Sequence, residues 1–152
     1  MVRRAALKDK PAQRVRLPVT LQMLTVFHGR SVADPSFNNI LFTACAFLAC
    51  FGLLRVSELT TPVPNSKKRG PRLSNVALLA NRAELTLLNT KTDKSKLGVM
   101  VVVAKQGSHP CPVRWLAEYV RRRPVSTQED LFFVLEDNSP ASAVWFRTML
   151  KD

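Results

Sequence analysis

The sequence predicts an α+β fold that is predominantly helical, with helices packed around a small three-stranded antiparallel sheet. Three observations lead to this prediction. A long apolar segment with helical periodicity fills most of residues 34–59. Three short, mostly apolar segments that are typical of strands follow in the middle of the chain. Two further helical patterns come after them, so the strands have helices on either side in the sequence.

The first two helices are predicted from their end signals. Thr20 is expected to cap a helix that stops at Gly29. Asp34 is expected to cap the next helix, with Pro35 at its first helical position. This second helix is apolar nearly all round and runs into Arg55, so we expect it to be central, contacted on several sides, and to carry Arg55 at its end.

The remaining elements follow a basic, proline-rich loop at residues 61–72. We predict strands at Val76–Leu79, Glu84–Leu88 and Val99–Val103. A helix is expected from Pro112 to Arg122, with Tyr119 among its core residues. A short buried stretch at residues 131–135 and an amphipathic helix at residues 140–150 complete the chain.

Composition limits the possible functions. The 152 residues favour one domain, and 23 basic against 11 acidic residues give a net charge of +12, which predicts an anionic partner, most often nucleic acid. The longest apolar run, at residues 40–54, is shorter than the roughly 18–20 residues that span a bilayer. Three cysteines without framework spacing indicate reduced thiols in the cytosol or nucleus. We expect no metal site and no cofactor.

The chemistry on offer is basic. Phosphate-binding glycine loops, paired carboxylates and a G-x-S-x-G nucleophile motif are all absent from the sequence. Arg55 offers a planar fork for phosphate, or else it forms a structural ion pair with Glu58 one turn later. The lysine-rich turn between the second and third strands either contacts DNA or only makes the hairpin soluble; its lysines are Lys91, Lys94 and Lys96.

Taken together, these segments resemble the catalytic domain of the tyrosine recombinase (phage integrase) family, over roughly residues 14–150. Leu53-Leu54-Arg55-Val56-Ser57-Glu58-Leu59 is similar to the family's first motif, G-L-R-x-S-E-L. Thr90-Lys91-Thr92-Asp93 is similar to its β-hairpin lysine segment. Arg16-Leu17-Pro18-Val19-Thr20 resembles the usual lead-in, and the helix after Pro110-Cys111-Pro112-Val113 resembles the one that follows the hairpin. The style is nearest to integrases of DIRS and Crypton mobile elements.

The resemblance implies the front part of a DNA breaking–rejoining domain and a set of roles. Arg55 would contact the scissile phosphate, Glu58 would orient it, and Lys91 would be the general acid. Residues 1–16 would be a basic arm or the remnant of a preceding domain, and residues 17–152 a partial catalytic domain. Double-stranded DNA would be the partner, in the nucleus. The further DNA-contacting candidates are Arg14, Arg16, Lys67, Lys68, Arg69, Lys94 and Lys96.

The sequence also departs from this family. It has no H-x-x-R motif, and its one tyrosine, Tyr119, lies among core residues rather than in the place of the family's nucleophile. We therefore expect a truncated, catalytically inactive form with residual DNA binding. We also expect the apolar helix to be left partly uncovered, so that the chain tends to self-associate. The alternative is a non-catalytic basic module that binds nucleic acid or protein and in which Arg55–Glu58 is structural.

Overall fold

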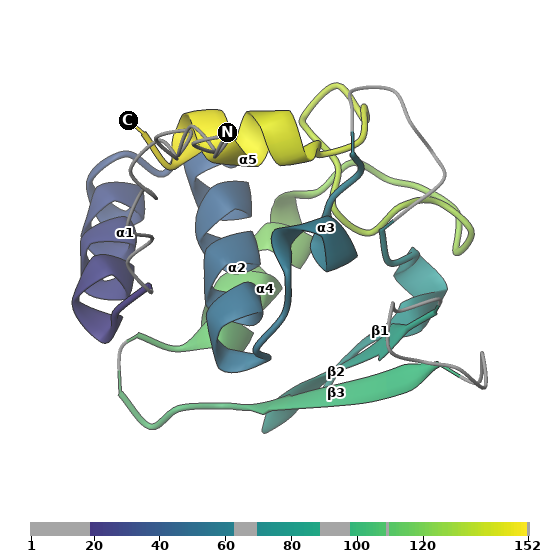
Figure 1. The fold of residues 1–152 in the computed structure, drawn as a ribbon, viewed down its shortest axis with the longest axis horizontal. Coiled ribbons are helices and arrows are strands. Elements are labelled where there is room, and N and C mark those ends of the chain that lie inside the picture. Colours follow the sequence, from purple (N-terminus) through teal and green to yellow (C-terminus); the bar gives the residue numbers. More distant parts are fainter. Residues whose placement is uncertain (1–18, 63–69, 89–97, 109, 152) are drawn as a thin grey trace, which may run out of the picture.

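The computed structural model describes residues 19–62, 70–88, 98–108 and 110–151 (Figure 1). Within these ranges five α-helices, one short 3-10 helix and three strands follow one another. Their order is α1 (Leu21–Ala33), α2 (Phe37–Phe51), α3 (Val56–Leu59), η1 (Leu73–Asn75), β1 (Val76–Leu78), β2 (Arg82–Leu87), β3 (Val99–Ala104), α4 (Pro112–Arg122) and α5 (Ala143–Met149). This α+β arrangement of helices and a small sheet confirms the predicted fold class.

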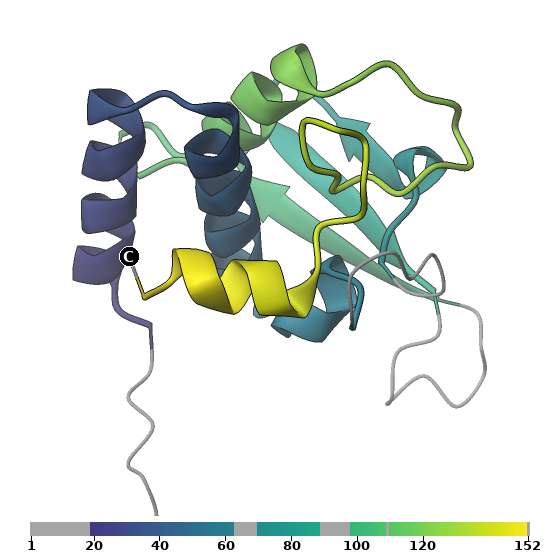
Figure 2. The same ribbon diagram turned by 90° about the horizontal axis from the view of Figure 1, so that it is seen from above.

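Helix α2 is the centre of the fold. It contacts α1, α3, α4 and α5, and every residue from Asn39 to Leu48 is buried. Helix α4 also contacts β1 and β3 and so lies between α2 and the sheet. Helix α5 crosses α2 and contacts both α2 and α3 (Figures 1 and 2). The predicted central helix is confirmed, because a helix that is apolar on all sides is stable only when it is covered on all sides.

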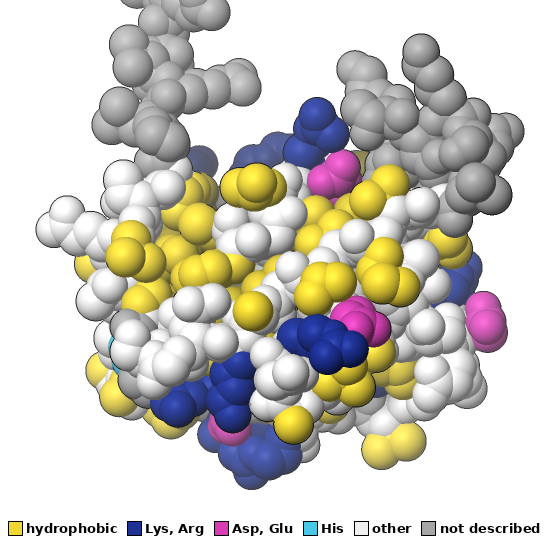
Figure 3. All heavy atoms as spheres, turned by 90° about the horizontal axis from the view of Figure 1, so that it is seen from below, with side chains coloured by type: hydrophobic (Ala, Val, Ile, Leu, Met, Phe, Trp, Pro, Cys, Tyr) yellow, Lys and Arg dark blue, Asp and Glu magenta, His cyan; other side chains and the backbone are white. Residues whose placement is uncertain are grey.

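The three strands form an antiparallel sheet in the order β1-β2-β3, as predicted. Strand β2 pairs with β3 without a bulge, from Arg82 opposite Ala104 to Leu87 opposite Val99. One face of the sheet turns Ala83, Leu85, Leu87 and Val103 into the core. Figure 3 looks at the outer surface of the molecule from the sheet side. Hydrophobic side chains are spread over this outer surface, with a few Lys and Arg side chains among them.

Helix α1 is longer than predicted. Gly29 does not end it, because a glycine in an exposed helical turn costs only about 1 kcal/mol relative to alanine, and contacts to α2 hold the turn that follows. The Ser31 hydroxyl lies 2.6 Å from the Thr43 hydroxyl and donates to the carbonyl oxygen of Asn39. Arg30 donates to the Asn39 side chain. These bonds extend the helix to Ala33.

The predicted start of α2 is also displaced. Asp34 belongs to the end of α1, since its backbone N–H donates to the carbonyl oxygen of Arg30. The N-cap of α2 is Ser36, and the helix begins at Phe37, one residue after that cap. Asp34 still serves this junction, because its carboxylate accepts hydrogen bonds from the Ser36 backbone N–H and from the Asn39 side chain.

The expectation that the apolar helix is left uncovered is wrong. Residues 40–48 are at most 7% exposed, because α1, α3, α4 and α5 surround them. At the two ends of the helix, Phe37 and the last turn from Ala49 to Phe51 are partly accessible, and Asn38 is exposed. None of the helices in the described part of the chain has the combination of length and hydropathy that a membrane crossing requires.

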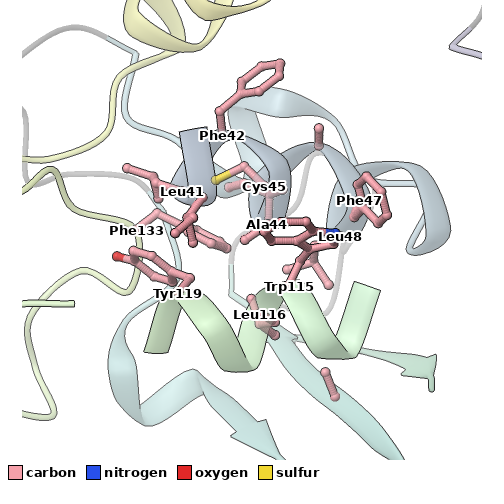
Figure 4. Close-up of a cluster of buried hydrophobic side chains, with 14 of the residues drawn as sticks. Leu41, Phe42, Ala44, Cys45, Phe47, Leu48, Trp115, Leu116, Tyr119 and Phe133 are labelled. Atoms are coloured by element: carbon pink, nitrogen blue, oxygen red, sulfur yellow. The ribbon is translucent and has the colours of Figure 1, made fainter. Parts of the chain in front are cut away.

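Helix α4 has the predicted bounds, Pro112 to Arg122. Figure 4 shows Trp115 and Tyr119 pointing from α4 toward α2. The predicted buried stretch at residues 131–135 is buried from Leu131 to Val134. The final helix is shorter than expected, since it begins at Ala143 after a Ser142 cap, whose hydroxyl accepts a hydrogen bond from the backbone N–H of Trp145.

Tyr119 is a core residue, as its sequence context suggested. Its ring packs on the rings of Phe132 and Phe133, and the residue has no exposed surface. The phenol donates to the carbonyl oxygen of Phe132 at 2.7 Å and accepts from the backbone N–H of Val134 at 3.0 Å. The hydroxyl thus satisfies two backbone groups of a buried, irregular segment.

A backbone clasp joins the segment after α3 to the segment before α5. Thr61 donates its N–H to the carbonyl oxygen of Ala141 and accepts at its own carbonyl from the N–H of Ala143. These bonds form a parallel bridge between Thr61 and Ser142. The clasp fixes α3 against α5, which it contacts.

Replacing Tyr119 by phenylalanine keeps the ring and removes only the hydroxyl. Because the Phe132 and Val134 backbone groups are then buried without this partner, we expect the free energy of unfolding to fall by about 1–3 kcal/mol. Denaturant unfolding measures the change. Thr148→Val removes an exposed hydroxyl that bonds only its own helix, and this control is expected to change the free energy by less than about 0.5 kcal/mol. Equal effects of the two substitutions would contradict the role given to Tyr119.

Tyr119 is also expected to titrate late. Burial raises the pKa of Tyr119 from 10.0 to about 12. The neutral form of Tyr119 therefore contributes its full stabilisation below about pH 10. Between about pH 10 and about pH 12 the tyrosine ionises in the unfolded chain but not in the folded one, so this stabilisation is lost as the pH rises. The loss in the free energy of unfolding is about 2–3 kcal/mol. Tyr119 is the only tyrosine, so tyrosinate absorbance follows it alone. A midpoint near the ordinary tyrosine pKa in the folded protein would contradict this prediction.

Candidate functional site

The site lies where the chain leaves α2, and this turn differs from the prediction. Helix α2 ends at Phe51 and does not reach Arg55. The backbone N–H of Leu54 bonds the carbonyl oxygen of Ala49, and that of Leu53 bonds the carbonyl oxygen of Cys50. This pair of bonds is the Schellman motif, which requires a left-handed residue directly after the helix cap. The reversal ends the helix four residues before Arg55.

Leu53 is the left-handed residue, with φ at 53°. Glycine is usual at such a position because a Cβ there is crowded by the backbone, at a cost of about 1–2 kcal/mol. The glycine of this turn stands one residue earlier: a Cβ on Gly52 would lie 2.8 Å from the carbonyl oxygen of Leu48. Because Gly52 has no Cβ, its backbone can lie close to the Leu48 carbonyl oxygen. The next residue, Leu53, adopts the left-handed conformation.

Arg55 is the N-cap of the short helix α3 and is braced by Glu58. The Arg55 backbone N–H donates to Glu58 Oε2 at 2.7 Å, and Arg55 Nη1 donates to Glu58 Oε1 at 3.3 Å. The Arg55 side chain is 64% exposed, against 18% for Glu58. The carboxylate therefore holds the arginine at two points, and among the described residues the guanidinium makes no other hydrogen bond. The side chain is mostly exposed, so the guanidinium is accessible to an anion.

Arg55 stands at the mouth of a hollow between the end of α2 and the β2–β3 hairpin, with a volume of about 320 Å³. Arg55 and Glu58 are the only charged side chains among its described lining, and the other walls are apolar. The lining residues are Gly52, Leu53, Leu54, Arg55, Glu58, Leu87, Val99 and Val101. The structure therefore brings Arg55 against the base of the hairpin, which lies 32 residues or more further along the chain.

Most of the predicted site residues lie outside the described part of the chain. Residues 89–97, which hold Lys91, Lys94 and Lys96, are not described, although the strands that border them line the hollow. The remaining candidates, Arg14, Arg16, Lys67, Lys68 and Arg69, also lie outside it, as do residues 1–16 as a whole. Only Arg55 and Glu58 of the predicted set are placed, and they are placed together.

Sequence reasoning missed the apolar part of the site. Leu53, Leu87, Val99 and Val101 share the hollow with Arg55, yet apolar residues in a turn and in strands indicate only core packing. One signal was available for Leu53: a helix that ends near Gly52 without glycine at the next position places a bulky residue in the left-handed turn.

The described side chains do not assemble a metal site. Within residues 19–62, 70–88, 98–108 and 110–151, no three His, Cys, Asp or Glu side chains come close enough to hold a metal ion. The Tyr119 hydroxyl is engaged inside the core. What the described site can do is hold an anion at Arg55 beside an apolar wall.

Comparisons with known proteins do not assign the chain to a family. No protein-family model matches it, and no curated protein matches it.

The strain at Leu53 predicts a difference between two substitutions. Leu53→Gly removes the crowded Cβ, whereas Leu53→Ala keeps it, and neither loses packing because the side chain is 92% exposed. We expect Leu53→Gly to be more stable than Leu53→Ala by about 1 kcal/mol, even though glycine gives the unfolded chain more freedom. Thermal and denaturant unfolding measure the difference. If the alanine variant is the more stable, residue 53 is not left-handed in solution.

Proposed function

We propose that the chain is a DNA-binding domain of the tyrosine recombinase type, related by descent to DNA recombination and integration by mobile elements. It acts in the nucleus on double-stranded DNA and is catalytically inactive in the form given by these residues. The observation that carries the proposal is the exposed Arg55, braced at two points by Glu58 at the base of the β2–β3 hairpin.

The geometry of Arg55 supports the proposal in physical terms. Guanidinium offers phosphate two parallel hydrogen bonds, and a fixed orientation keeps the loss of side-chain entropy on binding small. Glu58 provides this orientation and leaves the outer part of the fork accessible. An arginine followed three residues later by its supporting acid is the arrangement that the resemblance implies for a phosphate-binding arginine.

The backbone at Leu53 supports the same alignment. In the motif G-L-R-x-S-E-L the glycine falls on Leu53, and Leu53 has a positive φ of 53°. Glycine is the residue that adopts this conformation without cost. The chain thus keeps the turn for which the motif's glycine is suited, although the glycine itself is absent.

The hairpin gives a further reason for the proposal. Leu87 ends β2 and Val99 begins β3, and both line the hollow with Arg55. The connection between these strands contains Lys91, the proposed companion of Arg55. We propose that Lys91, Lys94 and Lys96 add phosphate contacts around the arginine.

Inactivity follows from the missing nucleophile. Covalent strand cleavage requires a nucleophile, and the only tyrosine among these 152 residues is Tyr119. Tyr119 is fully buried, and burial raises its pKa to about 12. It can neither reach a phosphate nor ionise near neutral pH, so binding without cleavage is the activity that remains.

The second candidate function is a basic module that is not of the recombinase type. The specific observation in its favour is that Glu58 caps α3 through the Arg55 backbone N–H, because a structural ion pair would use the same contact. The two functions differ in whether the Arg55 side chain itself binds phosphate.

Binding of a fluorescent DNA duplex at several salt concentrations tests the difference. Phosphate contacts predict a linear fall of log affinity with log salt, with a slope of about −0.9 for each neutralised phosphate. We expect Arg55→Ala to weaken binding and to make the slope shallower by roughly one. Fluorescence anisotropy measures both quantities.

Arg121→Ala is the matched control. Arg121 is 67% exposed and forms an ion pair with Glu118 at i,i+3, as Arg55 does with Glu58, but it lies in the last turn of α4. The Arg121→Ala substitution removes the same charge as Arg55→Ala, but it is expected to leave the slope of log affinity against log salt nearly unchanged. Equal losses for the two variants would favour the second candidate. Absence of binding by the wild type at low salt would contradict DNA contact in either candidate function.

A further inference from the structure

Leu53 combines two unfavourable features in one residue. It is the only leucine with a positive φ among the described residues, and 92% of its surface is exposed. Exposed leucines are common, but a leucine held in a strained turn usually has buried contacts that offset the strain. In the single chain no such burial exists for Leu53.

The surface beside Leu53 has the complementary shape. The hollow that Leu53 borders is walled by Leu54, Leu87, Val99 and Val101, and its volume of about 320 Å³ equals that of roughly ten waters. It can therefore accept a branched aliphatic side chain. A projecting leucine and an apolar hollow lie next to each other on one surface.

We propose that this surface binds a second copy of the same chain about a twofold axis. In a twofold interface the same patch meets itself, so a projection and a hollow side by side can fill one another twice. Leu53 of each copy enters the hollow of the other. Each copy thereby buries its exposed leucine and gains the contacts that offset the strained turn.

The charges on the rim fit the same arrangement. Among its described lining residues, the rim carries one cation, Arg55, and one anion, Glu58, 3.3 Å apart. A twofold axis through the hollow can place Arg55 opposite Glu58 of the partner subunit, and the reverse pair forms at the other end. The self-pairing is thus electrostatically complementary, as is expected of a specific interface.

The local charge does not oppose a second copy at this place. The chain has a net charge of +12, so two copies repel each other over most approaches. The described lining of the hollow has no net charge. Because the repulsion is long-range and screened by salt, the dimer is expected to strengthen as salt increases, which is opposite to the effect of salt on DNA binding.

Sedimentation equilibrium of the full chain without nucleic acid, at low and at high salt, tests the proposal. We expect a concentration-dependent monomer–dimer equilibrium, weak because the patch is small, and at least fivefold tighter at high salt. Leu53→Asn keeps a residue that tolerates the left-handed turn and removes the apolar side chain. It is expected to weaken the dimer at least tenfold.

Val125→Asn is the control, because Val125 is 99% exposed and does not line the hollow. It is expected to leave the dimer unchanged. Leu53→Gly gives a second variant in which the turn is unstrained, and it is also expected to be monomeric. A wild type that stays monomeric at high concentration and high salt would overturn the proposal, and so would equal effects of the Leu53 and Val125 variants. Since no DNA is present, neither result bears on the proposed DNA binding.

Discussion

The burial of α2 from Asn39 to Leu48 is the constraint from which the rest of the structure follows. A helix without a polar face cannot border solvent, so the fold surrounds it with α1, α3, α4 and α5. The sheet then packs on α4 rather than directly on the central helix (Figure 1). Two polar side chains inside pair with each other, since the Ser31 and Thr43 hydroxyls lie 2.6 Å apart.

The same burial shapes the site. An apolar helix has to end where the elements that surround it no longer bury it. The Schellman turn at Leu53 ends α2 at that point. Arg55 consequently owes its position to the turn and to the Glu58 carboxylate, and not to the rigidity of α2. An arginine fixed by a cap on a four-residue helix is exposed on its outer side, where its donors are accessible to an anion.

Elements with clear periodicity and clear end signals could be predicted from the sequence. The bounds of α4 and the order of the three strands are examples. Boundaries set by tertiary contacts could not be predicted. Gly29 is an end signal that bonds to α2 override, and Asp34 serves the junction from a position outside the helix that it was expected to cap.

The candidate site shows the same division. The Arg55–Glu58 pair was predictable because its three-residue spacing is local. The apolar walls were not, because they join residues from the turn after α2 and from two strands. The left-handed Leu53 was the hardest feature, since Gly52 beside it is the residue that sequence reasoning selects for that conformation. The glycine is needed at position 52 rather than 53 because a Cβ at position 52 would lie 2.8 Å from the Leu48 carbonyl oxygen.

The clasp at Thr61 links distant parts of the chain mechanically. Its hydrogen bonds close a loop of about 80 residues that contains the whole sheet and α4. On one side of the clasp lies α3, with Arg55 at its start, and on the other lies α5. The anchoring of Arg55 therefore depends in part on a segment near the other end of the described chain, because α3 is tied to α5 by the clasp and by direct contact.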